Sequence, residues 1–208
     1  MLKTIYLIRH GETDYNLKGV VQGSGIDADL NQKGLAQSKA FFEAYQHIAF
    51  DKIYTSALRR THQTAQGFID KNIPWEQHEG LNEISWGIRE GKIPSNIDNE
   101  YYRDLIMSWR NGEIDNPAEG GESPQDVQNR QIPVIETIIA RPEESTILIA
   151  MHGRAMRVLL ATISKLPLSL MDDFEHLNLC LYKIHYHYDT QEFEIISTND
   201  VSHLEGKV

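Results

Sequence analysis

The chain has 208 residues, of which 40% are apolar and 24% charged, and its formal net charge is −10. That length can bury a hydrophobic core, no apolar run is long enough to cross a bilayer, and the negative charge argues against nucleic acid or an anionic membrane as a partner. Because Cys180 is the only cysteine, no internal disulfide can form, and we expect a reducing, cytoplasmic location and a buried, inert thiol.

The first part of the chain alternates strand and helix signals. Residues 4–8 form a short continuous apolar run, typical of a strand covered on both faces, and 53–55 and 75–78 are further strand candidates. A helical pattern follows Asn31, which suits an N-cap. The apolar positions of the two helices expected between the strands are Leu35, Phe42 and Tyr45, then Leu58, Ala65, Phe68 and Ile69.

Residues 87–121 differ from their surroundings. They are polar, contain Pro94 and Pro117, and include a helical stretch over 101–109. We interpret this segment as an insertion or cap over the edge of the sheet. A helix is expected next over 127–138, with a kink or a break at Pro133, because proline removes a helical hydrogen bond.

The last part of the chain changes its period. Residues 146–150 predict a second buried strand, and 156–163 a helix. Alternation over 179–188, a turn, and residues 193–196 then indicate an antiparallel hairpin. The pattern predicts an α/β fold, a three-layer sandwich with a mostly parallel central sheet and helices on both faces. We expect an antiparallel edge near the C-terminus, a small inserted cap, and a single domain over 1–208.

Two of the buried strands end in a histidine followed by a glycine. These pairs are His10-Gly11 and His152-Gly153. Ligands of open α/β sheets bind beyond the carboxyl ends of the strands, so both imidazoles are expected in one crevice. Gly11 and Gly153 would let backbone N–H groups approach an anion closely.

Arginines near the same strand ends indicate a phosphate site. Arg9 adjoins His10, and Arg59 follows the strand candidate at 53–55. A guanidinium matches the oxygens of a phosphoryl group and keeps its charge. Two guanidiniums would also favour neutral His10, the form with a lone pair for nucleophilic attack.

At this point the sequence resembles a known family. Leu7–Thr13, with Asn16 just after, resembles the signature of the histidine phosphatase superfamily, the phosphoglycerate mutase-like proteins. The further matching blocks follow in the family's order, at 29–31 with Gly34, at 56–61 with Thr64-Ala65, at 81–83 with Gly87 and Glu90-Gly91, at 121–123 with Arg130, and at 150–153.

The resemblance implies a phosphatase that hydrolyses a small phosphomonoester through a phosphohistidine. His10 would be the nucleophile, and Arg9, Arg59 and His152 would hold the phosphoryl oxygens. Asn16 would add a hydrogen bond, Gln22 and Gly23 would line the pocket, and Glu83 would protonate the leaving alkoxide and later deprotonate water. Arg60 is expected to be a solvated or structural charge. No metal and no cofactor are required, because arginines supply the positive charge.

Several alternatives stay open. A cofactor-dependent phosphoglycerate mutase shares the blocks, but Trp86 replaces a usual tyrosine and 109–111 holds one basic residue where mutases usually show two. A non-catalytic phospholigand-binding module is a third possibility.

Arg154 could extend the pocket or face solvent. His185 and His187 alternate on one strand face, but we see no nearby carboxylate to complete a metal site. The substrate and the oligomeric state are not predicted.

Overall fold

The computed structural model describes residues 1–207, which form one six-stranded sheet in the order β3-β2-β4-β1-β5-β6. The strands are β1 (Leu2–Arg9), β2 (Lys52–Thr55), β3 (Trp75–Gln77), β4 (Thr146–Met151), β5 (Leu181–His187) and β6 (Glu192–Asp200). β3, β2, β4 and β1 pair in parallel in this order, whereas β5 pairs antiparallel with both β1 and β6. The predicted fold class is therefore confirmed.

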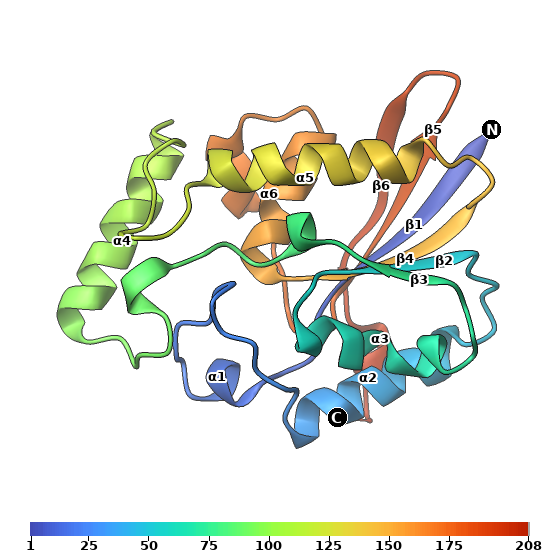
Figure 1. Cartoon of the computed structure of the whole chain (residues 1–208), viewed down its shortest axis with the longest axis horizontal. Coiled ribbons are helices and arrows are strands. Elements are labelled where there is room, and N and C mark those ends of the chain that lie inside the picture. Colours follow the sequence, from blue (N-terminus) through green and yellow to red (C-terminus); the bar gives the residue numbers. More distant parts are fainter. Residues whose placement is uncertain (208) are drawn as a thin grey trace.

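Helices cover both faces of the sheet (Figure 1). On one face lie α5 (Pro124–Ile139) and α6 (Gly153–Ile163), and on the other α2 (Gln32–Tyr45) and α3 (Arg59–Ile69). Alternate residues of β1 enter the two cores, Ile5 and Leu7 on the α6 side and Tyr6 and Ile8 on the α2 side. This double burial explains the continuous apolar run.

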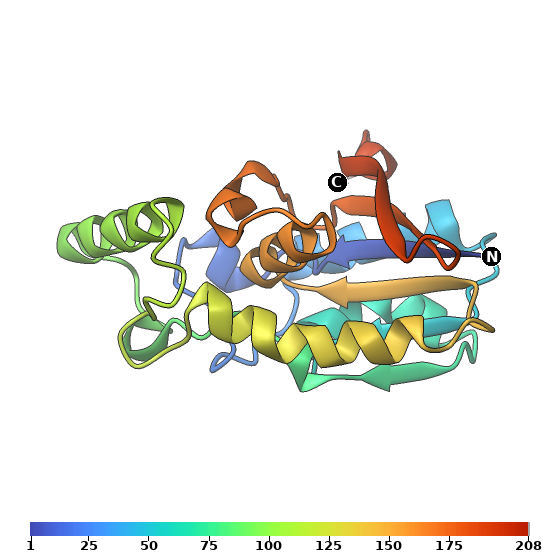
Figure 2. The same ribbon diagram turned by 90° about the horizontal axis from the view of Figure 1, so that it is seen from above.

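The segment predicted as a cap lies beyond the strand ends. Its main element is α4 (Asn96–Arg110), which begins earlier than the expected helix. Ser95 caps the helix there, because its side chain accepts from the Asp98 N–H. In Figure 2 the arrowheads of the parallel strands point toward α4. Trp109 fixes the end of the helix, since its buried indole donates to the Asn116 carbonyl at 2.7 Å.

The expected break at Pro133 is wrong, because α5 runs through this residue. Pro133 lies on the exposed side of the helix. Water can there replace the hydrogen bond that proline removes, so the helix continues. Within residues 1–207, no helix combines the length and the apolar character that crossing a membrane requires.

Two glycines let the segment after β1 pack on α2. A Cβ on Gly34 would lie 2.1 Å from the Glu12 carbonyl oxygen, and one on Gly11 would lie 2.7 Å from the Gly34 oxygen. The Asn31 side chain accepts from the Gly34 N–H at 2.8 Å and donates to Glu12 at 2.9 Å. This contact fixes the chain immediately after His10.

We predict that Gly34→Ala lowers the free energy of unfolding by about 1–3 kcal/mol, although alanine normally favours helices, because its Cβ would collide with backbone. Urea unfolding monitored by circular dichroism measures the change. Leu35→Ala, on the exposed side of the same helix, is the control and should change stability by less than about 0.5 kcal/mol. Equal effects would contradict the packing argument.

Candidate active site

The two histidines at the strand ends lie side by side. β1 and β4 are adjacent and parallel, with Arg9 in register with Met151, so His10 and His152 leave the sheet together. Their ring centroids are 5.2 Å apart. Both rings are almost fully buried, at 3% and 0% exposure.

His10 is held as a neutral ring with one defined tautomer. Its Nδ1 lies 2.7 Å from the Gly11 carbonyl oxygen. A carbonyl only accepts, so Nδ1 carries the hydrogen and Nε2 keeps its lone pair. Burial, followed by the charges of Arg60 and Arg9, holds the pKa of His10 well below its usual value. This imidazole is therefore available as a nucleophile at neutral pH.

Arg9 places an unneutralised guanidinium beside His10. Its Nη1 lies 3.2 Å from Nδ1 of His176, and its Nε is buried without a hydrogen-bond partner. Burial lowers the pKa of Arg9, while the charge of Glu83 acts in the opposite direction. A buried donor without a partner costs free energy, so this group is poised for an anion.

The second guanidinium of the site belongs to Arg60, which is fully buried. Its Nε donates to His152 Nδ1 at 3.1 Å, Nη1 to the Ile26 carbonyl at 2.6 Å and Nη2 to the Gly23 carbonyl at 3.2 Å. Burial lowers the pKa of Arg60 to about 10, so the group stays charged at neutral pH. Among residues 1–207, no carboxylate forms an ion pair with either Arg9 or Arg60.

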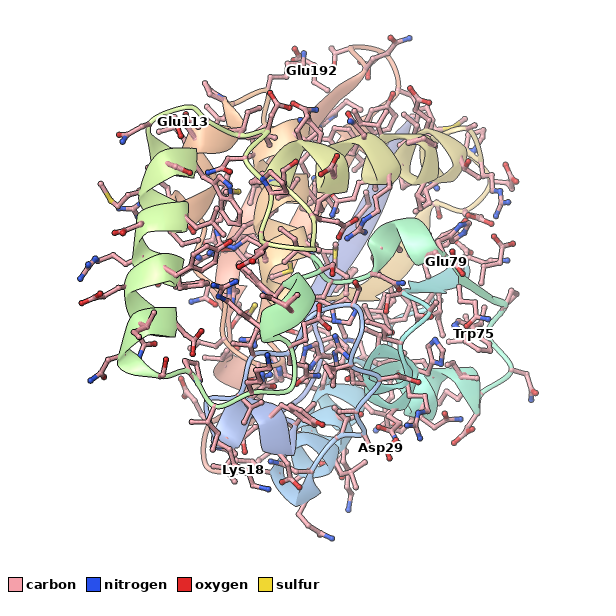
Figure 3. All side chains as sticks on the ribbon, turned by 60° about the vertical axis from the view of Figure 1, so that its left-hand side comes forward. Lys18, Asp29, Trp75, Glu79, Glu113 and Glu192 are labelled. Carbon is pink, nitrogen blue, oxygen red and sulfur yellow. The ribbon has the colours of Figure 1, made fainter. Side chains whose placement is uncertain are left out.

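The expected placement of Arg59 beside His10 is wrong. Arg59 is exposed and pairs with Asp27 at 3.0 Å and Asp29 at 3.2 Å; Figure 3 labels Asp29 near the lower edge of the molecule. Arg60, expected as a solvated or structural charge, occupies the site instead. Helical spacing could have distinguished the two arginines, because Arg60, Thr64 and Phe68 recur at intervals of four on the buried face of α3.

His152 orients Arg60. Because its Nδ1 accepts from the guanidinium, its Nε2 carries the hydrogen and donates to Ser56 Oγ at 2.7 Å. Burial and the nearby charge of Arg60 lower the pKa of His152 well below its usual value. The ring is thus a neutral link between the ends of β2 and β4.

The carboxylate of Glu83 faces the same cluster and is 7% exposed. It accepts from the N–H groups of Arg154 at 3.1 Å, Ala155 at 2.8 Å and Ile84 at 2.9 Å. Two of these donors lie in the first turn of α6, where free N–H groups favour an acidic side chain. Glu83 is therefore held rigidly near both guanidiniums.

Of the residues expected around the phosphate, Gln22 and Gly23 contact Arg60, whereas Asn16 contacts Thr13 and Asn178. Asn16 Oδ1 accepts from the Thr13 N–H at 3.2 Å and from Asn178 at 3.3 Å, and Asn16 also lines a cavity beside the site. The Gln22 side-chain amide is oriented so that its nitrogen donates to Thr13 Oγ1 at 2.6 Å and its oxygen accepts from Arg60 Nε at 3.0 Å. Gly23 accepts from Arg60 through its carbonyl and would clash with Glu90 if it carried a Cβ.

The two glycines that follow the histidines have packing roles. The expectation that Gly11 offers its N–H to an anion is wrong, since that N–H donates to Thr64 Oγ1 at 3.0 Å. A Cβ on Gly153 would lie 2.7 Å from Cε1 of His176.

His176 was not predicted as a site residue, because it lies in a loop without sequence periodicity. Burial and Arg9 lower the pKa of His176 to about 3, so it contacts Arg9 as a neutral ring.

Arg154 neither faces solvent nor enlarges the pocket. It is buried, pairs with Asp172, donates to the Tyr102 hydroxyl at 3.2 Å, and lies 5.6 Å from the Trp109 ring centroid. Its backbone N–H meanwhile holds Glu83. Arg154 therefore connects the N-terminus of α6 to α4.

The C-terminal hairpin also requires a correction. His185 pairs across the sheet with Glu194, so a carboxylate does accompany His185 and His187. The three potential ligand atoms lie within 4.8 Å of one another. Glu194 was not predicted to lie beside these histidines, because the register of the hairpin depends on the turn between its strands. Cys180 is buried as expected, and burial raises its pKa to about 11.

We predict that Arg60→Ala weakens binding of inorganic phosphate by about tenfold to a hundredfold, the usual cost of one charged hydrogen-bonding group. Arg59→Ala, one residue away, should change the affinity by less than about twofold, because its side chain points to solvent. Isothermal titration calorimetry measures both. The reverse order of effects would contradict the placement of Arg60.

We also predict that the free energy of unfolding falls as the pH is lowered from 7 to 5. His10 and His152 have lowered pKa values when folded, so below about pH 6.5 the unfolded chain binds more protons. Each ring contributes at most about 1.4 kcal/mol per pH unit. Urea titrations of wild type, His10→Gln and the exposed-site control His47→Gln test this. Identical pH slopes for the two variants would refute the assignment to His10.

Residues 5–200 match the model of the histidine phosphatase superfamily (branch 1). A 2,3-bisphosphoglycerate-dependent phosphoglycerate mutase of Bradyrhizobium diazoefficiens is 30% identical over 172 residues, 79% of this chain and 82% of the mutase.

Two solved structures share the fold. Bacillus stearothermophilus YhfR has a TM-score of 0.84 at 29% identity, covering 98% of this chain and 100% of YhfR. A mycobacterial glucosyl-3-phosphoglycerate phosphatase has a TM-score of 0.81 at 25% identity, covering 96% and 99%. With the paired histidines and buried arginines, these matches confirm the resemblance seen in the sequence: the chain belongs to the histidine phosphatase superfamily.

Proposed function

We propose that this protein is a phosphatase that hydrolyses small phosphomonoesters through a phosphohistidine on His10. One observation carries the proposal: a buried, neutral imidazole with free Nε2 lies beside two guanidiniums that have no ion-pair partner within the described residues 1–207. A phosphoryl group would provide both guanidiniums with a direct anionic partner, in addition to the nearby charge of Glu83. Membership of the superfamily, with a phosphatase among the similar structures, supports the same chemistry.

In the first step, His10 Nε2 attacks phosphorus opposite the ester oxygen. The N–P bond forms, the P–O bond to the alcohol breaks, and Glu83 in its protonated form gives its proton to the leaving oxygen. Arg9 and Arg60 stabilise the charge on the transferred oxygens. His152 acts through Arg60, whose Nε it fixes.

In the second step, water attacks the phosphohistidine. Glu83 takes a proton from this water, the N–P bond breaks, and inorganic phosphate leaves with neutral His10 restored. Because guanidiniums supply the positive charge, we propose that no metal and no cofactor take part. We further propose that 1–208 is one cytoplasmic domain in which 87–121 caps the site.

A phosphoglycerate mutase is the second candidate, favoured by the 30% identity to one. A mutase must protect its phosphohistidine from water and return the phosphoryl group to an organic acceptor. The two functions therefore differ in the fate of one intermediate, not in the groups that form it.

The test is to trap that intermediate. We predict that full-length protein quenched in base after mixing with radiolabelled phenyl phosphate carries base-stable, acid-labile label, and that His10→Ala carries none and loses phosphate release. His47→Ala is the matched control and should behave as wild type. The labelled protein is then mixed with 3-phosphoglycerate. Transfer of the labelled phosphoryl group to water indicates a phosphatase, whereas transfer to 3-phosphoglycerate indicates a mutase. Normal turnover in His10→Ala would refute the proposal.

The acid role of Glu83 makes a separate prediction. Glu83→Gln should slow hydrolysis of an alkyl phosphate about a hundredfold or more, but that of 4-nitrophenyl phosphate far less, because nitrophenolate leaves without a proton. The exposed Glu79, labelled in Figure 3, provides the control Glu79→Gln. Equal losses for both esters would show that Glu83 has another role.

A further inference from the structure

A cavity of about 350 Å³ adjoins the phosphate-binding cluster. Asn16 and Gln22, which border that cluster, form one wall. Trp86, Tyr101 and Tyr102 form the opposite wall, which belongs to the segment around α4. If the phosphoryl group binds at His10, the remainder of the ester extends into this space.

Among residues 1–207, the only cationic side chain that lines the cavity is that of Arg89, and carboxylates balance its charge. Its Nη1 pairs with Glu119 at 2.9 Å, and its Nε lies 3.6 Å from Asp98. The Arg89 guanidinium is also stacked 3.5 Å from the centroid of Tyr101. Asp98 in turn caps α4 through Ser95. Arg89 Nε is buried without a hydrogen-bond partner, but Glu119 and Asp98 already balance the charge of the guanidinium, and a ligand carboxylate would enter the cavity beside Asp98.

The aromatic wall is fixed in place. The Trp86 ring centroid lies 5.2 Å from that of Tyr102 and 5.9 Å from that of Trp109. Arg154 donates to the Tyr102 hydroxyl at 3.2 Å, and Arg154 is itself held by Asp172. Held apolar rings favour a flat apolar group, while the amides of Asn16 and Asn99 offer hydrogen bonds to hydroxyls.

We propose that this cavity binds the leaving group and selects esters of uncharged, flat alcohols while rejecting those with a carboxylate. The selection rests on the proposed phosphatase function. It follows from the paired state of Arg89 and from the aromatic wall. Esters such as 3-phosphoglycerate are then poor substrates, because their carboxylate would enter the cavity without a cation.

The test compares 2-naphthyl phosphate with 6-carboxy-2-naphthyl phosphate, which differ by one distant carboxylate. We expect wild-type kcat/KM to favour the uncharged ester by at least about tenfold. Glu119→Gln combined with Asp98→Asn releases Arg89 and should reduce this preference several-fold. Glu113→Gln removes the same kind of charge beyond the other end of α4 (Figure 3) and should leave the preference unchanged.

The outcomes separate the two proposals. Absence of phosphate release from either ester would refute the phosphatase function. Hydrolysis of both esters with equal kcat/KM, or a preference for the carboxylate, would overturn the selection and leave the phosphatase function standing. An unchanged preference in the double variant, with its fold checked by circular dichroism, would also overturn the role of Arg89.

A different observation supports a second site. His187 Nε2 lies 3.1 Å from Glu194 Oε2, and His185 Nε2 or Nδ1 completes a set whose ligand atoms all lie within 4.8 Å. Two imidazoles and a carboxylate are a common ligand set for Zn²⁺, and bonds of about 2.0–2.2 Å would draw the three ligand atoms closer together. We propose that this face of the β5–β6 hairpin binds a divalent transition metal ion.

Calorimetric titration of the full chain with Zn²⁺ alone tests this site. We expect one bound ion, and at least about a tenfold loss of affinity in His187→Ala, because a zinc ligand is removed. His47→Ala, an exposed histidine outside the group, should bind as wild type. Absence of Zn²⁺ binding, or equal binding by the two variants, would overturn the site.

Discussion

Buried positive charge without an ion-pair partner is the constraint on which this structure depends. Arg9 and Arg60 lie against His10, and in the described part of the chain the one side chain that Arg9 contacts through a hydrogen bond is His176. Burying such charge costs several kcal/mol per ion unless a counter-charge arrives. A bound phosphoryl group would offset this cost, and the same charges keep His10 neutral. Attraction for an anion and a neutral His10 are thus two effects of one arrangement.

The fold maintains this arrangement through short, specific contacts. Parallel pairing of β1 and β4 brings residues 10 and 152 to one edge, and carbonyl groups of the 23–26 loop hold Arg60. The first turn of α6 holds Glu83. Backbone groups position His10, Arg60 and Glu83, so these side chains need little rearrangement when an anion binds. The chain around α4 adds a cavity wall of different chemistry, in which aromatic rings lie beside the paired charges of Arg89 and Asp98.

Much of this could be predicted from sequence because hydrophobic periodicity reports burial directly. The run at 4–8 identified β1, and the run at 146–150 identified β4, together with the histidines that follow them. Adjacent arginines were harder, since Arg59 and Arg60 have the same chemistry and only helical phase separates them; a one-residue error moves the charge from the site to solvent. The contacts of His176 and Glu194 could not be predicted. They depend on the placement of a loop and on strand register, which local sequence patterns do not determine. Pro133 was misjudged because its exposure depends on tertiary packing.

The central claim, that His10, Arg9 and Arg60 surround one anion, can be tested most directly by a crystal structure with orthovanadate. We predict vanadium bonded to His10 Nε2, its equatorial oxygens within hydrogen-bond distance of both guanidiniums, and its apical oxygen facing the cavity between Asn16 and Trp86. Vanadate bound away from His10, or held by Arg59 instead of Arg60, would contradict the account.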